Sequence, residues 1–403
     1  MSNFKLIIYS QIKKHLSLFV LGLSSACFFL SNILLKDILS DIDYGLYSIL
    51  FTYLSILSSF GLFGSDHVLL RTSKLEGNNL IIDYRLIYVI LIILLLVSLF
   101  SSYFIYMFYD FGVSYFSLLV LSFAIILLKL LYQISRMLSM FTLSQLTLNT
   151  WKIGLSLFVF FSIYIRTDVC LQTIILYLLC FCLISLTSFF PLFSHSKFKK
   201  LDYSRNSLLK LGAGFFITMM SVSLLSFLDR FIIEHQFGLI LMGEYFFYVN
   251  LYLFPFMLFS TYIGFKELIF FKKFFSIQVF KKKLIRIFSI SILAGFVYFM
   301  ITVVIQEIGI YDFRMSENRK LIFVLIIFGV IKITSSMLSA AMGATADVKD
   351  LKKINIFTIF LFVVLLITIP LCSSILNIVV LFIFIWVLRY SMYFILLLNQ
   401  YRD

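Results

Sequence analysis

The chain has 403 residues, of which 62% are hydrophobic and only 13% are charged, and its mean hydropathy is +1.08. Soluble domains carry roughly a quarter charged residues and less than about half apolar ones, so this composition excludes a soluble protein and indicates an integral membrane protein. A net charge of +14 suggests nucleic-acid binding only in a soluble protein; here it must first be compared with the membrane topology.

The N-terminal segment resembles a secretory signal peptide, since Lys5, Lys13 and Lys14 precede an apolar run. The run continues past Cys27 to Leu35, which is long enough to cross a membrane, and no lipoprotein cleavage motif precedes the cysteine. We therefore expect an uncleaved first membrane helix.

Apolar segments of about 20 residues, the length that crosses a bilayer of roughly 30 Å, recur along the whole chain. The sequence predicts twelve spans: 16–35, 44–64, 86–108, 113–133, 151–165, 171–193, 209–228, 243–262, 284–305, 320–341, 355–372 and 375–398. The connections are short. The longest one on the N-terminal side of the membrane, 263–283, is basic and apolar, and it suits either an amphipathic surface segment or a continuation of the eighth span.

The positively charged residues support this count, because cytoplasmic loops carry an excess of Lys and Arg. With a cytoplasmic N-terminus, most of the 33 Lys and Arg residues fall in inside segments. The predicted external loops hold only Lys36, Arg166, Arg230, Arg314, Arg319 and Lys320. Three more, Lys129, Lys332 and Arg389, lie within spans. We expect both termini to be cytoplasmic. The excess of basic residues is then explained by membrane topology, and we expect no nucleic-acid partner.

Two short motifs recur at nearly the same spacing. "DYGLYSILFTYL" opens the second span and "MGEYFFYVNLYL" opens the eighth, while "SRMLSM" and "SSMLSA" close the fourth and the tenth. Equivalent motifs in equivalent helices predict an internal repeat of six spans, which gives both halves the same orientation and a cleft between them. We expect an N-terminal six-helix lobe, 1–200, and a C-terminal six-helix lobe, 201–403, joined by a polar linker at 194–208.

The stretch "LDRFIIEHQFGLILMGEYFF", together with "DIDYGLYS" and "FGLFGSDHVLLR", resembles the O-antigen flippases of the Wzx type. These form part of the polysaccharide transport branch of the multidrug/oligosaccharidyl-lipid/polysaccharide (MOP) exporter superfamily. The resemblance implies an all-α polytopic protein of the MATE/MOP-like fold in the bacterial inner membrane. It also implies a substrate, an oligosaccharide repeat unit linked to undecaprenyl pyrophosphate, which is moved to the outer leaflet and polymerised there by partner machinery.

Charged residues within spans are functional candidates, because each costs about 2.5–3.5 kcal/mol to insert. Lys332 lies mid-span, and Ser335, Ser336, Ser339 and Gly343 follow on the same helix face. We expect this face to bind the substrate, Lys332 being either a cavity cation or a lysine paired internally.

Arg389, beside Tyr390 and Tyr393, is similarly deep and is a second candidate cation. Lys129 is a third, although it lies near enough to the inner boundary to reach it by snorkelling, which is the simpler interpretation.

Asp229 and Arg230 follow the seventh predicted span, and we expect them in a short external turn as a gate or substrate contact. Two further patterns admit both a packing and a binding interpretation. They are the hydroxyl stripe Ser48, Thr52, Ser55, Ser59 and the tyrosine series Tyr245, Tyr248, Tyr252, Tyr262.

No motif indicates an enzyme, a cofactor or a metal. The phosphate-binding GxxxxGK[ST] motif is absent from the sequence, the five Cys residues have neither CxxC spacing nor neighbouring His, and the "DID" at Asp41 and Asp43 stands alone. Two alternatives to the flippase remain. An O-antigen polymerase would need a long external loop, whereas the longest here is 306–319, and a cation-coupled exporter would need deep acidic residues, whereas the deep charges in the predicted spans are basic.

Overall fold

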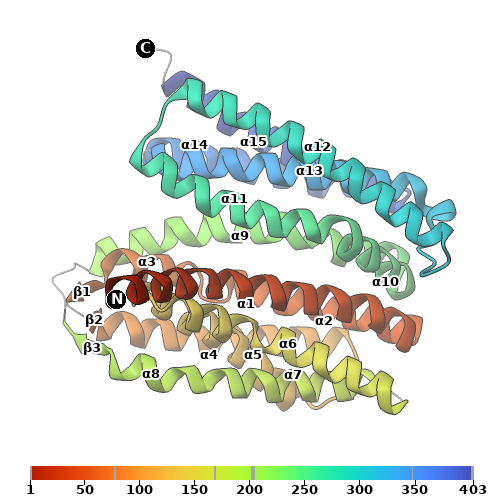
Figure 1. The fold of residues 1–403 in the computed structure, drawn as a ribbon, viewed down its shortest axis with the longest axis horizontal. Helices are drawn as coiled ribbons and strands as arrows, with labels where there is room; N and C mark the ends of the chain where they lie inside the picture. The colour runs from red at the N-terminus through yellow and green to blue at the C-terminus, as the bar shows by residue number, and fades with distance from the viewer. Residues whose placement is uncertain (1, 77–78, 168, 201–204, 347, 401–403) are drawn as a thin grey trace. The chain divides into compact units, whose positions relative to one another are not determined.

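The computed structural model describes residues 2–76, 79–167, 169–200, 205–346 and 348–400. This part of the chain is almost entirely helical (Figure 1). Its elements are α1 (Ser2–Ile38), α2 (Asp41–Phe60), α3 (Ser65–Thr72), β1 (Lys74–Glu76), β2 (Asn79–Asp83), α4 (Tyr84–Phe108), α5 (Tyr115–Met137), α6 (Phe141–Ile165), α7 (Leu171–Ser185), η1 (Leu186–Ser188), α8 (Phe189–Ser194), β3 (Ser196–Lys199), α9 (Arg205–Phe237), α10 (Leu239–Tyr248), η2 (Val249–Leu253), α11 (Phe254–Lys273), α12 (Ile277–Glu307), α13 (Met315–Thr345), α14 (Val348–Thr368), η3 (Ile369–Leu371) and α15 (Ile375–Gln400).

Within the described residues, twelve helices are long and apolar enough to cross a membrane, which confirms the predicted number of spans. They are packed into two compact units, Met1–Leu228 and Asp229–Asp403, here called unit 1 and unit 2. The division falls within α9. The predicted boundary near residue 200 stays a prediction.

Two span boundaries were predicted wrongly. The fifth span begins at Phe141 instead of residue 151, because polar residues interrupt its apolar pattern. The side chains of Ser144, Thr147 and Asn149 are buried and donate to carbonyl groups three or four residues earlier, so the helix itself satisfies them. The seventh span continues past residue 228 to Phe237, so Asp229 and Arg230 lie within a helix and not in an external turn.

The predicted long loop at 263–283 is also helical. α11 continues to Lys273 and α12 begins at Ile277, so the helix-continuation alternative was right. A π-helical segment, η2, precedes Pro255 of α11, where the backbone lacks a donor. The hydroxyl of Tyr298 donates to the carbonyl of Leu251 in this segment at 2.6 Å, and so satisfies an acceptor there.

A small three-stranded sheet, which the sequence did not predict, lies in unit 1. β1 pairs antiparallel with β2, and β2 pairs parallel with β3, from Leu80 opposite Ser196 to Asp83 opposite Lys199. The sheet connects the segment after α3 to the segment after α8. Part of the predicted linker at 194–208 is therefore a strand of unit 1, while residues 201–204 lie outside the described residues.

In each unit one helix packs against several others. In unit 1, α5 packs against α2, α4, α6 and α7, and in unit 2, α13 packs against α11, α12 and α15 (Figure 1). Glycines allow close approach at these contacts. A Cβ atom at Gly154 of α6 would lie 2.3 Å from the ring of Phe181, and one at Gly329 of α13 would lie 2.5 Å from the ring of Phe256.

We predict that Gly154→Ala destabilises the protein by about 1–3 kcal/mol, since the added methyl group overlaps the Phe181 ring. Gly214→Ala in α9 is the matched control, because a Cβ atom there meets nothing within 4 Å. Removing glycine from an open helical position should be neutral or stabilise by up to about 1 kcal/mol. Thermal unfolding of both variants in detergent measures the difference, and equal melting temperatures would contradict the close α6–α7 contact.

Candidate functional site

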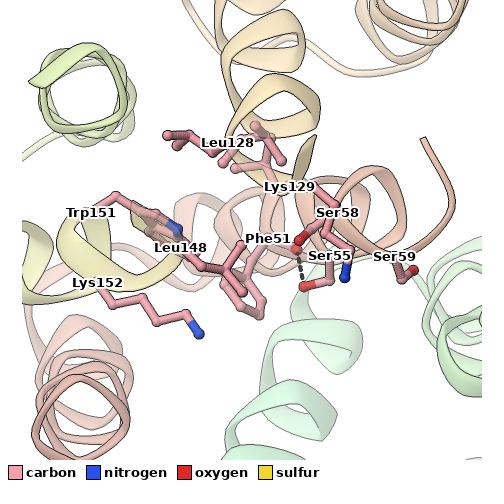
Figure 2. Close-up of a pocket in the computed structure, with 11 residues that line it drawn as sticks. Phe51, Ser55, Ser58, Ser59, Leu128, Lys129, Leu148, Trp151 and Lys152 are labelled. Atoms are coloured by element: carbon pink, nitrogen blue, oxygen red, sulfur yellow. Dashed lines mark hydrogen bonds between the residues drawn. The ribbon is translucent and has the colours of Figure 1, made fainter. Parts of the chain in front are cut away.

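A pocket of about 200 Å³ lies within unit 1, between α2, α5 and α6 (Figure 2). Its polar lining consists of two lysines and three serines, and its apolar lining is aliphatic and aromatic. The lining residues are Phe51, Leu54, Ser55, Ser58, Ser59, Ile125, Leu128, Lys129, Leu148, Trp151 and Lys152. Among the described residues, no Asp or Glu lines this pocket, so its local charge is positive.

The two lysines enter the pocket from different helices, Lys129 from α5 and Lys152 from α6 (Figure 2). The ammonium of Lys152 donates to the side-chain oxygen of Asn149 at 2.9 Å and lies 5.5 Å from the ring centroid of Trp151. That of Lys129 lies 5.5 Å from the ring centroid of Tyr132. Neutral amide and aromatic groups stabilise these cations only in part, and the charge of Asp66 acts on Lys129 from beyond ion-pair distance. Among the described residues, neither ammonium forms an ion pair with a carboxylate, so both could donate to an anion in the pocket.

A polar chain continues along α5 from Lys129. The side-chain amide of Gln133 donates to Asp66 at 3.0 Å, and Arg136 donates to the Gln133 oxygen at 3.5 Å. Lys129, Gln133 and Arg136 therefore follow one face of α5, but they have different surroundings. Lys129 lines the pocket, whereas snorkelling to the membrane boundary was the simpler expectation. Its contact with substrate stays a prediction.

The hydroxyl stripe of α2 divides into two parts. Ser48 and Thr52 are fully buried and donate to carbonyl groups of their own helix, at 2.6 and 2.7 Å, so they serve packing. Ser55 and Ser59 line the pocket, and Ser59 also exchanges a hydrogen bond with Ser223 of α9 at 3.0 Å. The packing interpretation therefore holds for Ser48 and Thr52, and the binding interpretation stays a prediction for Ser55 and Ser59.

Sequence reasoning missed Lys152, because the predicted fifth span began at residue 151 and Lys152 was counted with the inside residues at its start. In the structure Lys152 lies well inside α6. Its signal was the spacing of Gln145, Asn149 and Lys152, which puts three polar groups on one helix face.

Lys332 of unit 2 lies against aromatic rings. Its ammonium is 3.3 Å from the ring centroid of Trp386 on α15 and 5.1 Å from that of Phe328. Among the described residues, no carboxylate forms an ion pair with it. Stacking on an aromatic face is worth about 2 kcal/mol when the contact is desolvated, so Trp386 offsets part of the cost of this intramembrane charge.

Arg389 is buried, with 4% of its surface exposed, and is held by neutral groups. It donates from Nε to the Thr358 hydroxyl at 3.2 Å and from a terminal nitrogen to the Tyr393 hydroxyl at 2.7 Å. These contacts favour an internal packing role for Arg389 over the predicted cavity cation. Its contact with substrate stays an untested prediction.

The predicted polar face of α13 is split between two neighbours. Ser335 is buried and donates to the carbonyl of Lys332 at 2.8 Å, whereas Ser339 is exposed. Both hydroxyls lie near the hydroxyl of Tyr390 on α15. Ser336 instead borders Gly264 of α11. The face therefore contributes to helix packing, and the proposed substrate contacts of Ser335 and Ser339 stay predictions.

Asp229 and Arg230 are both buried in α9, although the sequence predicted an external turn. The Asp229 carboxylate accepts from the Tyr245 hydroxyl at 2.5 Å through one oxygen, and the other oxygen has no hydrogen-bond partner in the part of the chain that the structure describes. The guanidinium of Arg230 lies 5.2 Å from the ring centroid of Phe246. Asp66 is buried as well, so the expectation that the deep charges are all basic was wrong.

The contact between Asp229 and Tyr245 has a counterpart in unit 1. There, the hydroxyl of Tyr47 donates to the side-chain oxygen of Asn32 at 3.0 Å. In each unit, the tyrosine of the repeated Gly-x-Tyr motif bonds back to the preceding long helix, α1 or α9. Both tyrosines are fully buried. The repeated motif therefore has a structural role in each unit, joining consecutive helices.

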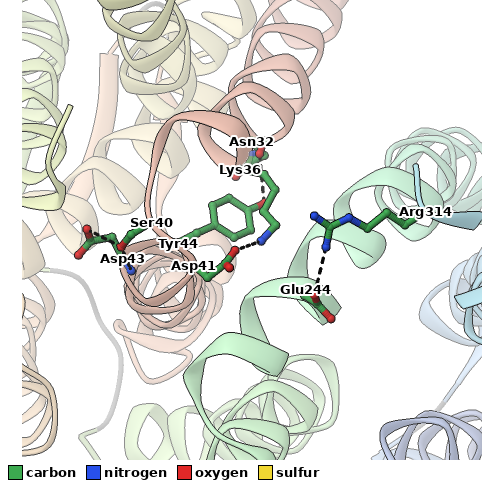
Figure 3. A network of polar contacts seen from close by, with 8 residues as sticks. All are labelled: Asn32, Lys36, Ser40, Asp41, Asp43, Tyr44, Glu244 and Arg314. Atoms are coloured by element: carbon green, nitrogen blue, oxygen red, sulfur yellow. Dashed lines mark hydrogen bonds and ion pairs between the residues drawn. The ribbon is translucent and has the colours of Figure 1, made fainter. Parts of the chain in front are cut away.

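Several other charged residues form ion pairs near these helix ends (Figure 3). In unit 1, Lys36 pairs with Asp41 at 2.5 Å, and Ser40 caps α2: its hydroxyl accepts from the backbone N–H of Asp43 and donates to the Asp43 carboxylate. In unit 2, Glu244 and Arg314 lie 3.7 Å apart. The "DID" carboxylates at Asp41 and Asp43 thus serve the start of α2.

Metal-binding clusters of three or more His, Cys, Asp or Glu side chains are absent from the described residues. The five cysteines, Cys27, Cys170, Cys180, Cys182 and Cys372, are free. Outside the membrane-spanning helices, the Thr173 hydroxyl lowers the pKa of the Cys170 thiol.

No protein-family model matches the sequence, and no curated protein matches it. Solved structures match over nearly the whole chain. One is "Lipid II flippase MurJ, inward closed conformation", with a TM-score of 0.67 and 16% sequence identity over 96% of this chain and 87% of that chain. The chain has the fold of the MOP-type transporters. Another, "Crystal structure of MATE in complex with MaD3S", gives a TM-score of 0.57 and 13% identity over 97% of each chain. The predicted fold class is confirmed.

We predict that the pocket binds inorganic diphosphate, because two intramembrane ammonium groups face it without a carboxylate. The protein has two tryptophans, Trp151 and Trp386, so a Trp386→Phe background leaves Trp151 in the pocket wall as the fluorescent reporter. Diphosphate should change its emission saturably. Lys129→Gln with Lys152→Gln should weaken binding at least about tenfold, since each charged hydrogen bond contributes about 1.5–3 kcal/mol.

The control for this experiment removes two exposed lysines, Lys349→Gln with Lys352→Gln, and so alters the net charge equally. Equal weakening in control and pocket variant would mean that diphosphate binds through general charge and not through the pocket.

Proposed function

We propose that the chain is a flippase for a lipid-linked oligosaccharide, which it moves across the bacterial inner membrane by alternating access. The observation that carries the proposal is the unit 1 pocket, in which Lys129 and Lys152 face one space without a carboxylate. Two cations in one membrane-embedded pocket cost several kcal/mol to insert. A diphosphate offsets that cost, and a diphosphate is the group that joins sugars to a polyprenyl carrier.

The rest of the pocket suits the same substrate. Hydroxyls of Ser55, Ser58 and Ser59 can donate to phosphate oxygens or sugars, and the rings of Phe51 and Trp151 give flat surfaces for sugar rings. The fold similarity to the lipid II flippase MurJ supports the transport of a lipid-linked substrate. We infer the specific substrate, an O-antigen or other surface-polysaccharide repeat unit on undecaprenyl pyrophosphate, from the resemblance to Wzx-type flippases. A polysaccharide polymerase would then act next.

A cation-coupled exporter of the same superfamily is the second candidate. It is favoured by the buried Asp229, whose carboxylate has one oxygen without a hydrogen-bond partner, and by the fold similarity to MATE. A polymerase is less favoured, because the connection between α12 and α13 runs only from Ile308 to Arg314. It leaves little chain for an external catalytic loop.

Deletion of the gene should trap complete repeat units on undecaprenyl pyrophosphate at the cytoplasmic face, because assembly continues while translocation stops. The measurement is the protection of the lipid-linked sugar from a membrane-impermeant oxidant added to intact spheroplasts. Lys152→Ala should reduce surface polysaccharide while the protein stays at its normal level, and Lys197→Ala, an exposed lysine of the same unit, is the control.

Single units transferred to the external acceptor in the deletion strain would instead identify a polymerase. Unchanged surface polysaccharide, combined with greater sensitivity to cationic dyes, would identify an exporter.

A further inference from the structure

The end of α11 and the start of α12 form a basic hairpin, defined here as residues 267–286. It carries six cations: Lys272, Lys273, Lys281, Lys282, Lys283 and Arg286. From Leu268 to Gln306 the sequence contains no Asp or Glu. The connecting turn runs only from Phe274 to Ser276. The hairpin is thus a dense positive surface at one end of unit 2, on the side predicted to be cytoplasmic.

The basic hairpin is rigid, because its aromatic side chains are part of the unit 2 core. Phe271 and Phe280 are buried and lie 5.9 Å apart between ring centroids. They belong to one core cluster with Met337 of α13 and Leu397 of α15. The cations are therefore held on a packed scaffold, unlike those of a flexible basic tail.

Only one of the six cations has a carboxylate partner among the described residues. The ammonium of Lys283 lies 2.6 Å from Glu267 and 3.5 Å from the ring centroid of Phe270, which ties α12 back to α11. The other five are exposed: Lys272, Lys273, Lys281, Lys282 and Arg286. Their charges are available to an external anion.

The position of the lysines on α12 is unfavourable without such an anion. Lys281, Lys282 and Lys283 follow one another in the second turn of a helix, where their charges repel and the positive end of the backbone dipole opposes them weakly. Ser276 at the N-cap position makes no side-chain hydrogen bond to the first turn. A bound anion would offset both the repulsion among the lysines and the dipole.

Large apolar side chains are exposed beside the cations. Phe274 in the turn is 57% exposed, and Ile285, one residue before Arg286, is 67% exposed. An aromatic and an aliphatic group next to lysines suit the boundary between headgroups and acyl chains, where apolar surface leaves water and the ammonium groups stay at phosphate level. A soluble anion would leave these apolar groups in water.

We propose that the basic hairpin is a binding site for the phosphate headgroups of anionic glycerophospholipids in the surrounding leaflet. Lys272, Lys273, Lys281, Lys282 and Arg286 contact the phosphates, and Phe274 and Ile285 enter the acyl boundary. This site is distinct from the unit 1 pocket and does not depend on which substrate the protein moves.

The test is native mass spectrometry of the full chain released from detergent with defined lipids. Phosphatidylglycerol should remain bound, and phosphatidylcholine should not. Lys273→Gln, Lys281→Gln and Lys282→Gln together should weaken phosphatidylglycerol binding by at least about tenfold, since each cation near an anionic surface contributes about fivefold in affinity. The same substitutions to Arg should preserve binding, which separates charge from folding.

The matched control removes three exposed lysines of unit 1, Lys197→Gln, Lys199→Gln and Lys200→Gln, and should leave the lipid bound. Equal retention in hairpin variant and parent, or equal loss in the control, would overturn the proposal. Inorganic phosphate displacing the lipid from the parent at equal concentration would also overturn it, since the apolar contacts would then contribute nothing. With the unsubstituted chain, binding should weaken as salt is raised, and binding that is independent of salt would contradict the assignment.

Discussion

The cost of placing polar groups in hydrocarbon is the constraint on which the rest of the structure depends. Every backbone donor and acceptor in a span must be satisfied within it, which leaves helices as the only solution for a single chain of this composition. The same cost governs the side chains. Serines and threonines of the spans, such as Ser48 and Thr52, donate to carbonyl groups of their own helix, so they add small volume without leaving a polar group unsatisfied.

Cations within the spans are held in two different ways. Arg389 donates to the hydroxyls of Thr358 and Tyr393, and Lys332 lies on the Trp386 ring with the charges of Asp229 and Arg389 near it, so groups of unit 2 itself hold both cations. Lys129 and Lys152 instead face a pocket. The first arrangement stabilises unit 2 from within, whereas the second leaves charge available to a ligand. Because only the unit 1 lysines face a pocket, we place the proposed substrate site in unit 1, although the sequence had favoured Lys332 of unit 2.

The sequence correctly predicted the features that depend on composition and on the spacing of apolar segments and motifs. Long apolar segments gave the number of spans, and the repeated Gly-x-Tyr motif pointed to tyrosines that bond back to Asn32 and Asp229. It failed where polar residues are satisfied inside a helix. Asn149 interrupts the apolar pattern of α6, so Lys152 was not recognised as an intramembrane residue. The charge of Asp229 suggested that α9 ends before it, but the helix continues, because the hydroxyl of Tyr245 donates a hydrogen bond to the buried carboxylate.

The central claim is that the protein itself moves a diphosphate-linked lipid between leaflets, and transport by the purified protein in vesicles tests it most directly. A fluorescent undecaprenyl-diphosphate saccharide is placed in both leaflets, and an impermeant quencher is added outside. If the account is right, the fraction protected from the quencher falls toward zero in vesicles that contain the protein, while a labelled phosphatidylcholine stays protected. A protected fraction equal to that of protein-free vesicles, under every ion gradient applied, would contradict it.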